Sequence, residues 1–420
     1  MKEKITYGLD FGTSNTAIVA NYKGILRPIP LSSDGSLITP TVLYFPPDGR
    51  VYKFGDEAVK EYLARKMKGR FMQSLKSFLP SESFSGTYIS GFGHRYLHDL
   101  IALIFSEVKK RADILIGENI RSVVIGIPAK FVNELDNSSR NLAEERLRMA
   151  ADMVGFKEVN FILEPIAAAY YYETLLNSSE TVLVGDFGGG TTDFTIMNLS
   201  PNGNKKIDRK DDILATSGIP IAGNNFTSDL MRNKLLKYFG QGSKFKSWDK
   251  WLEMPVHILQ MICKWENLAF MRTPEYRKTI NMLLNKTDDY DGISRLHTLI
   301  EDNLGYTLFQ SIERAKIELS GNVVSKILFS ESNIKIDEEV SREEYDYLIG
   351  YMYEKIDETI QEMLKVSSKN PKDIDAVFLT GGTSFTPLIK DYFTKKFGKN
   401  KIKSKDNFTD VANGLAASMV

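Results

Sequence analysis

Two segments of the chain repeat one succession of residue types that suits phosphate binding. Residues 7–16 read YGLDFGTSNT and residues 184–193 read VGDFGGGTTD, so each places Asp-Phe-Gly between an apolar run and a turn rich in Gly, Ser or Thr. Such a turn directs backbone N–H groups and hydroxyls at a phosphate, while the aspartate faces a hydrated cation. Two copies predict two lobes that close on one nucleotide from opposite sides.

Three aspartates and one glutamate are the candidate cation-facing and acid–base groups. A single aspartate after a strand is usually a turn or cap residue, so Asp10, Asp186 or Asp193 alone says little. Their matched placement favours a functional role, because the glycines at 188–190 let the backbone approach a ligand. Glu164 ends an apolar run before a proline, where it either complements a helix dipole or lies beside the cation and the attacking water.

Two other segments have residue types that suit contact with a flat, polar ligand. Residues 378–387 read FLTGGTSFTP, which is either a tight strand-to-helix connection or a site of close approach to such a ligand. Glu313, Lys316 and Ser320 share one face of a predicted helix at spacings of three and four. Taken alone, this trio is more typical of an exposed ion-pair face.

The elements that would position these residues alternate between strands and helices, which predicts an α/β architecture. The polar residues 202–212 predict an exposed hairpin tip, and the alanines at 167–169 predict close packing of their helix. We expect strands at 4–9, 16–22, 41–45, 51–54, 123–128, 181–184, 194–197 and 375–380, and helices at 97–116, 141–154, 166–176, 308–319 and 410–419.

Composition narrows the classes of function. The chain has 420 residues, is 42% hydrophobic and 26% charged, and has a formal net charge of zero, which argues against nucleic-acid and membrane-surface partners. A single cysteine, Cys263, fits a reducing, cytoplasmic compartment. We find no signal-peptide pattern and no apolar stretch near the roughly 18 residues of a membrane span.

Other chemistries find little support in the residue pattern. The segment 240–244 has the wrong spacing for a GxxxxGK[ST] phosphate loop, and no GxSxG nucleophile motif occurs. His94 and His98 are four residues apart, but they lack further histidine or cysteine neighbours for a metal site. Residues 243–297 contain all three tryptophans, and we expect them to form a helical subdomain that offers a surface to a protein partner.

Taken in order, the motifs resemble the nucleotide-binding domain of Hsp70 chaperones, within the actin/sugar-kinase/Hsp70 ATPase superfamily. The likeness is closest to short bacterial Hsp70-like proteins of the YegD type, which lack a peptide-binding domain. It extends over nearly the whole chain, through the segments 8–16, 74–79, 127–129, 164–169, 186–193, 222–226, 312–320, 381–383 and 410–419.

The resemblance implies a role for each matched residue. Lys76 inherits the place of a catalytic lysine and Pro128 that of a switch proline, while Asp10 and Asp186 would orient water around Mg²⁺. Glu164 and Asp193, with Thr191, would act on the attacking water. The resemblance assigns ATP or ADP to residues Gly12, Thr13, Ser14, Asn15, Gly188, Gly189, Gly190, Gly223, Glu313, Lys316, Ser320, Gly381, Gly382, Thr383 and Phe385.

Some positions depart from the family pattern. Phe385 stands where the family often has an arginine that stacks on adenine, so an aromatic ring would stack on the base instead. Phe408 and Thr409 replace an aspartate and a glutamate, and the insertion at 133–138 makes the position of the family's switch arginine ambiguous.

The resemblance also implies an overall organisation and an activity. We expect an actin-like ATPase (ribonuclease H-like) fold with a mixed sheet in each lobe and a nucleotide cleft between the lobes. Lobe I would comprise residues 1–178, with an inserted subdomain at about 36–100, and be completed by a helix at 408–420. Lobe II would comprise residues 179–407, with a helical subdomain at about 225–320.

The expected activity is slow, Mg²⁺-dependent ATP hydrolysis that opens and closes the lobes. The alternatives are a nucleotide-gated binding module without hydrolysis, an actin-like filament former, and a small-molecule kinase of the same superfamily.

Overall fold

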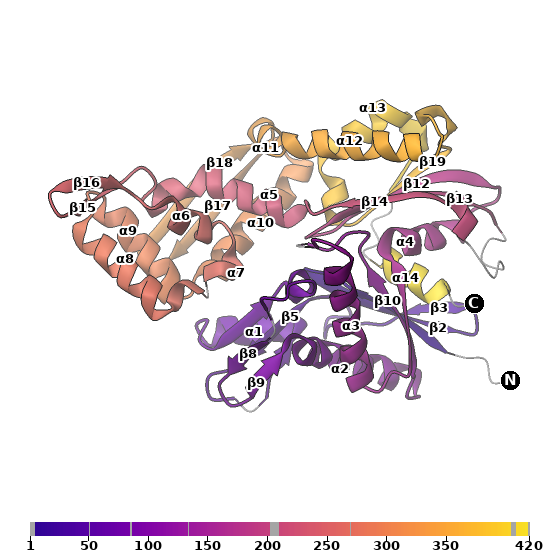
Figure 1. Ribbon diagram of the computed structural model, residues 1–420, viewed down its shortest axis with the longest axis horizontal. Helices are drawn as coiled ribbons and strands as arrows, with labels where there is room; N and C mark the ends of the chain where they lie inside the picture. The colour runs from indigo at the N-terminus through magenta and orange to yellow at the C-terminus, as the bar shows by residue number, and fades with distance from the viewer. Residues whose placement is uncertain are drawn as a thin grey trace. The chain divides into compact units, whose positions relative to one another are not determined.

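The computed structural model describes residues 5–49, 51–84, 86–132, 134–201, 210–268, 270–404 and 409–418. The chain divides into two compact units (Figure 1). Unit 1 contains residues 1–64, 69–223 and 352–420, and unit 2 contains residues 65–68 and 224–351. These units are defined by the compactness of the chain, whereas the lobes expected from the sequence rest on the resemblance to a family, so the lobe boundaries stay a prediction.

Unit 1 is built on two sheets with the same strand order. The first sheet runs β11-β10-β1-β2-β3, with β4 also paired to β2, and the second runs β20-β19-β12-β13-β14. In each, three strands form an antiparallel meander, a fourth pairs in parallel with the first strand of the meander, and a fifth pairs in parallel with the fourth. The bounds in the first sheet are β1 Thr6–Phe11, β2 Asn15–Tyr22, β3 Ile25–Pro28, β4 Ile38–Pro40, β10 Ser122–Ile127 and β11 Glu158–Leu163; in the second they are β12 Glu180–Phe187, β13 Thr192–Leu199, β14 Ile213–Ile219, β19 Ala376–Thr380 and β20 Ile402–Ser404.

The two sheets exchange helices. Helix α4 (Glu164–Glu173) follows the last strand of the first sheet, yet it packs on β12 and β13 of the second. Helix α14 (Asp410–Ala417) follows the second sheet and packs on β1 and β2 of the first. The two helices lie side by side (Figure 1), and a Cβ at Gly414 would lie 1.6 Å from the backbone oxygen of Ala167. Close packing of the alanine-rich helix is therefore confirmed.

Other helices and small sheets of unit 1 complete its layers. Helix α2 (Leu97–Ile116) and helix α3 (Asn137–Met153) pack against each other beside the first sheet. The strands expected at 41–45 and 51–54 are present as β5 and β6, which pair antiparallel. The remaining bounds are β5 Val42–Phe45, β6 Lys53–Phe54, α1 Gly55–Ala64, β7 Arg70–Gln73, η1 Leu75–Phe78, β8 Gly86–Ile89, β9 Gly93–Tyr96, η3 Lys210–Asp212, α12 Gly350–Val366 (shared with unit 2), η7 Pro371–Asp373, η8 Gly382–Phe385, α13 Pro387–Phe397 and η9 Lys399–Lys401.

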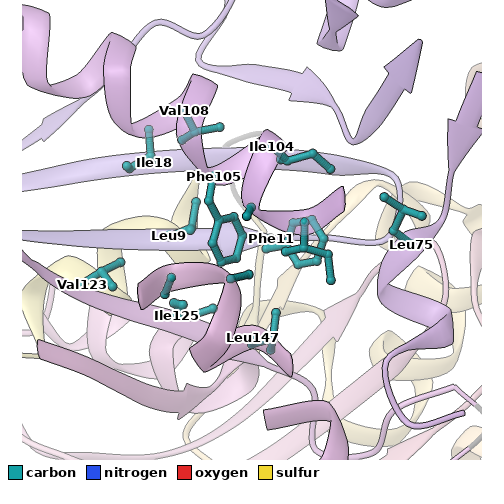
Figure 2. Close-up of a cluster of buried hydrophobic side chains, with 14 of the residues drawn as sticks. Leu9, Phe11, Ile18, Leu75, Ile104, Phe105, Val108, Val123, Ile125 and Leu147 are labelled. Carbon is teal, nitrogen blue, oxygen red and sulfur yellow. The ribbon is translucent and has the colours of Figure 1, made fainter. Parts of the chain in front are cut away.

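A buried hydrophobic cluster joins the first sheet to α2 and α3 (Figure 2). Alternate residues of β1, such as Leu9 and Phe11, point into it, because successive side chains of a strand face opposite sides of the sheet. The rings of Phe11 and Phe105 meet edge to face with centroids 5.3 Å apart. Leu75 and Leu147 belong to the same cluster, so the segments that carry them are fixed to one core.

Unit 2 is mainly helical, with two antiparallel hairpins. Helices α8 and α9 pack against each other, and α10 packs on the β17–β18 hairpin. The bounds are α5 Gly223–Leu230 (whose first residue belongs to unit 1), η4 Met231–Leu235, η5 Leu236–Phe239, β15 Lys244–Ser247, β16 Lys250–Glu253, α6 Val256–Ile262, α7 Trp265–Leu268, η6 Phe270–Arg272, α8 Pro274–Lys286, α9 Tyr290–Glu301, α10 Gly305–Gly321, β17 Val324–Glu331, β18 Ile334–Ser341 and α11 Arg342–Leu348.

The prediction of a helical subdomain at 243–297 was wrong for its first part. The tryptophan-rich segment 243–297 begins with the hairpin β15–β16, and its helices start only at Val256. The hairpin turns at Trp248, whose φ of 55° is left-handed, and β15 alternates half-buried Phe245 with exposed lysines. Most of the predicted hairpin tip at 202–212 lies outside the described residues. No helix among the described residues is long and apolar enough to span a membrane.

Candidate functional site

The two phosphate-type turns have the same local geometry. In the first, the N–H of Gly12 donates to the carbonyl of Asn15 at 2.9 Å, and in the second Gly188 N–H donates to Thr191 at 3.0 Å. Each turn joins two antiparallel strands, β1 to β2 and β12 to β13. The sequence repeat is therefore a structural repeat at the same place in two matching sheets.

The two turns approach each other within unit 1. A Cβ at Gly190 would lie 2.9 Å from the hydroxyl oxygen of Thr13, so the second turn reaches the first where it has no side chain. The carbonyl of Gly188 accepts the Thr383 hydroxyl at 3.1 Å and the Gly223 N–H at 3.3 Å. Four of the predicted phosphate-site and base-site segments thus meet around the second turn.

Position 381 requires glycine for two reasons, its backbone conformation and its close approach to Phe187. Its φ is 83°, and a Cβ there would lie 2.2 Å from the carbonyl oxygen of Phe187 at the end of β12. The turn after β19 therefore lies directly against the second phosphate-type turn. Gly382 begins the short helix η8 that follows, and Gly189 lies within the phosphate-type turn itself.

Lys76 lies on the short 3₁₀ helix η1 and forms a buried ion pair with Glu164. The two side chains are only 5% and 8% exposed, so the pair is shielded from water. Burial acts to lower the pKa of Lys76, but the nearby charges of Glu164, Asp10 and Asp193 outweigh it and raise the pKa. The structure thus brings the predicted catalytic lysine to the predicted cation-facing glutamate.

Three aspartates share the surroundings of this ion pair. Burial, reinforced by the charge of Glu164, raises the pKa of Asp10 to about 7 and the pKa of Asp193 to about 7. The same causes, with the charges of Asp10 and Asp193, raise the pKa of Asp186 well above its ordinary value. Four carboxyl groups around one lysine leave this region short of positive charge.

Asp193 is also bound to the segment that follows β10. Its Oδ1 accepts the backbone N–H groups of Ala129 at 2.8 Å and Lys130 at 3.3 Å. Arg140 binds the same segment through its carbonyls, donating to Ala129 at 3.0 Å and to Pro128 at 3.4 Å. Hydrogen bonds to its carboxylate oppose the rise of the Asp193 pKa without cancelling it.

Arg140 is a residue that the sequence reasoning missed. The insertion at 133–138 obscured its position, and the backbone carbonyls that it binds carry no residue signature. A usable signal was present, because Arg140 is the first arginine after the insertion and lies in the first turn of α3.

The predicted base-contacting trio lies on α10 in unit 2. Glu313 and Lys316 form an ion pair at 2.7 Å, and both bind the Thr227 hydroxyl, at 2.7 Å and 3.2 Å. Ser320 lies about one turn farther along the helix. The structure therefore brings Glu313 and Lys316 together through Thr227. Ser320 is related to them only by its position on the same helix.

Phe385, the other predicted base contact, has one ring face occupied. The Lys390 ammonium lies 4.9 Å from the centre of the Phe385 ring, a cation–π contact between η8 and α13. Both side chains are half-buried. The second face of the ring is the one that an aromatic base would need.

Direct metal ligation is not evident in this cluster. In the described ranges, no three His, Cys, Asp or Glu side chains converge closely enough to hold a metal ion. His94 and His98 both lie against the ring of Tyr96, with centroids 4.9 Å and 5.4 Å away.

Comparison with known proteins gives consistent matches. A family model described as "Hsp70 protein" matches residues 6–244 and 297–419. "Chaperone protein DnaK" of Elusimicrobium minutum is 25% identical over 97% of this chain and 56% of its own length. The same-named proteins of Thermotoga neapolitana and Mycoplasmopsis synoviae are 23% and 24% identical over 99% of this chain, and 59% and 58% of their own lengths. The chain thus spans a little over half the length of these relatives, and the predicted actin-like α/β fold class is confirmed.

Proposed function

Because the chain belongs to the Hsp70 family, we propose that it binds ATP with Mg²⁺ and hydrolyses it slowly. The observation that carries the proposal is the buried Lys76–Glu164 pair among Asp10, Asp186 and Asp193, beside two matching turns. Charge of this kind, held away from bulk water, acts strongly on a transferring phosphoryl group.

The two turns would hold the phosphates through their backbone N–H groups and hydroxyls. Thr13, Ser14 and Asn15 supply the first turn, while Gly188–Thr191 supply the second. Lys76 would neutralise charge that develops on the terminal phosphoryl oxygens. Its raised pKa keeps it protonated at neutral pH for this role.

The carboxyl groups fit a divalent cation held through water. The pKa of Asp10 and the pKa of Asp186 are both raised by burial among other acids, so a nearby dication would favour their charged forms. When bound, Mg²⁺ supplies positive charge that draws off negative charge from the phosphates. Asp10 and Asp186 would orient its water shell, as oxygen donors suit this ion.

Asp193 and Glu164 are the candidates to orient or deprotonate the attacking water. Asp193 suits a base, because its pKa of about 7 lies near the pH at which it would work. Glu164 would stay paired with Lys76 and hold that ammonium in place. Thr191, whose hydroxyl binds Asp193, would help to fix the carboxylate.

The base and ribose would be held by the remaining predicted residues. Gly381–Thr383 and Phe385 supply one set of contacts, and Glu313, Lys316 and Ser320 supply another. Phe385 in place of an arginine predicts weaker selection for adenine over guanine.

A lobe closure driven by nucleotide state belongs to the same proposal, with lobe I at 1–178 and 408–420 and lobe II at 179–407. Small-angle scattering with ATP and with ADP tests it.

The hairpin β15–β16 is our candidate surface for a protein partner. Trp248 at its tip is 93% exposed and Trp251 on β16 is 53% exposed, an unusual display of large aromatic side chains. Cys263 is buried and is the chain's one cysteine, which fits work in a reducing, cytoplasmic setting. A pulldown with wild type and a Trp248→Ser, Trp251→Ser double variant, in ATP and in ADP, tests the surface.

The decisive experiment is calorimetric titration of wild type and Asp193→Asn with ATP and ADP in Mg²⁺, with phosphate release followed in parallel. We expect both proteins to bind nucleotide and only the wild type to turn it over. Binding without turnover in the wild type favours a nucleotide-gated module, and absence of binding overturns the proposal. Light scattering that rises with ATP favours a filament, and phosphate transfer to an added small molecule favours a kinase.

A further inference from the structure

Helix α3 carries a buried arginine that the proposed function does not use. Arg146 is 8% exposed, and its guanidinium donates to four backbone carbonyls. Nη1 lies 3.1 Å from the carbonyl oxygen of Phe78, 2.7 Å from that of Leu79 and 2.9 Å from that of Ser81, and Nη2 lies 3.1 Å from that of Phe84. The guanidinium is therefore the centre around which this segment folds.

The four carbonyls belong to the segment that directly follows the catalytic lysine. Phe78 is the last residue of η1, the same short helix that carries Lys76, and the N–H of Leu79 donates to the Lys76 carbonyl at 3.2 Å. On its other side, η1 is entered through Ser74, a residue with a left-handed φ of 57°. A single 3₁₀ turn with such an entry has little intrinsic stability, so it depends on outside contacts.

The chemistry of arginine suits this task. A guanidinium is planar and offers five donors in a fixed fork, so it can bind several carbonyls at once. Burial lowers the pKa of Arg146, which shows that the charge is taken out of water at a cost. The four carbonyl dipoles offset that cost. Leu147 beside it and Leu75 beside Lys76 lie in one hydrophobic cluster, so α3 is a rigid base for the contact (Figure 2).

We propose that Arg146 is a positioning residue that fixes the 78–84 segment and thereby holds Lys76 in place against Glu164 and the phosphoryl group. The inference rests on the proposed function and deepens it, because it names the group that sets the geometry of the catalytic lysine. Lys76 must reach the reacting phosphoryl group in one position, and misplacement by about 1 Å can cost about 100-fold in rate.

The main test variant is Arg146→Lys, which keeps the charge and most of the volume but cannot bind four carbonyls. We expect kcat for ATP hydrolysis to fall about 10- to 100-fold while KM changes little, because the ground-state phosphate contacts of the turns remain. The matched control is Arg148→Lys on the same helix. Arg148 is exposed and donates to one carbonyl, that of Val159, at 3.0 Å, so its change should leave kcat within about twofold.

A double variant separates positioning from general destabilisation. If Arg146 acts through Lys76, Arg146→Lys has almost no further effect on the residual activity of Lys76→Ala. An equal fold-loss in both backgrounds overturns the proposal, as does an unchanged kcat in Arg146→Lys alone.

Amide hydrogen exchange gives a readout that needs no turnover. We expect Arg146→Lys to speed exchange in residues 74–84 and to leave the strands of the two sheets unchanged. If the wild type does not hydrolyse ATP, the proposed function fails and exchange alone decides the positioning role. Unchanged exchange in 74–84 then overturns it, and faster exchange confined there supports it.

Discussion

The two sheets of unit 1 share a design but differ in the chemistry at their turns. Both place an aspartate at the end of the first strand, Asp10 in one and Asp186 in the other, and both close the turn with the same hydrogen bond. The residues opposite these aspartates differ. Ala17 pairs with Asp10, whereas Asp193 pairs with Asp186. The two sheets thus share the phosphate-type turn, but only the second sheet has a second carboxylate, that of Asp193, opposite the first.

The neighbouring turns deepen this contrast. After β10 of the first sheet, the N–H groups of Ala129 and Lys130 bind Asp193 of the second copy. After β19 of the second sheet, Gly381 instead lies against the backbone of its own sheet at Phe187. The asymmetry teaches that the second copy is incomplete by itself, since the segment after β10 of the first sheet supplies the N–H groups that hold its carboxylate.

The largest expected effect is on the rate of ATP hydrolysis, when the carboxylate found only beside the second turn is removed. Asp193→Ala gives position 193 the residue that Ala17 supplies opposite Asp10, and it removes the proposed base. We expect single-turnover ATP hydrolysis to fall by about 10²- to 10⁴-fold, the range for a lost general base. Asp391→Ala, at an exposed position on α13, is the control. Hydrolysis that stays within a few-fold of wild type would falsify the role of Asp193.

The next largest effect concerns how tightly each sheet holds its exchanged helix. Gly414→Ala should lower the free energy of unfolding by about 3 kcal/mol or more, because its Cβ would lie 1.6 Å from the Ala167 carbonyl oxygen and backbone must move. Chemical denaturation measures the loss. The control is Gly321→Ala. Gly321 is the last residue of α10 and has open space around its Cβ position, so this change should leave the free energy of unfolding unchanged or raise it slightly. Equal stability of both variants contradicts the tight crossing.

The charge asymmetry predicts a pH dependence of stability. The pKa of Asp193 is raised to about 7, so the folded protein retains a proton that the unfolded chain loses near pH 4. Its contribution to the free energy of unfolding therefore falls as pH rises from about 4 to about 7 and is constant above that. Without nucleotide, Asp193→Asn should exceed wild type in stability at pH 8, on the order of a few kcal/mol, and by much less at pH 5.

Asp136→Asn provides the opposite case for this measurement. Asp136 caps α3, and its hydrogen bonds to Ser139 lower its pKa. Its charge stabilises the fold above about pH 4 and loses that effect as pH falls through the folded pKa. The variant should therefore be the less stable protein at pH 8, and the two differences should have opposite signs. The same sign for both differences rejects the raised pKa of Asp193.

The smallest effect tests what the two copies still share. Thr16 of β2 and Thr192 of β13 hold equivalent places, opposite Phe11 and Phe187. The Thr16 hydroxyl makes a buried hydrogen bond with the Thr41 hydroxyl at 2.8 Å, and the Thr192 hydroxyl donates a partly buried one to the Ile221 carbonyl at 2.7 Å. Thr16→Val and Thr192→Val should each lower the free energy of unfolding by about 1 kcal/mol. Urea denaturation checks both, and a clear difference between them would show that the copies have diverged here as well.

The sequence was most informative where a residue type restricts the backbone conformation around it. This holds for the repeated Asp-Phe-Gly motifs, the proline after Glu164 and the paired glycines at 381–382, and the structure brings these segments together as expected. The apolar runs likewise identified the strands that are buried almost along their whole length, such as β10, β12 and β19, because a strand covered on both faces is continuously hydrophobic. Less buried strands such as β3 and β11 were not predicted.

The sequence revealed less where contacts involve the backbone or a distant partner. Arg140 and Arg146 bind carbonyl groups, which every residue has, so neither contact leaves a pattern in the sequence. Lys76 and Glu164 are 88 positions apart, and only the resemblance to a family pointed to the lysine. The hairpin at 244–253 was mistaken for helix, because its Trp and Lys residues have no strong alternation of burial on the exposed strand.

The helix exchange has a consequence for how the protein is made. Strands β1 and β2 are translated early, but Ala17 and Val19 are buried against Ala412 and Ala416 of α14, which is translated after every strand of both sheets. That face of the first sheet stays uncovered on the ribosome while the rest of unit 1 and all of unit 2 are synthesised. The nascent chain therefore carries an exposed apolar sheet face through most of its synthesis, and its native unit 1 closes only when one short helix arrives.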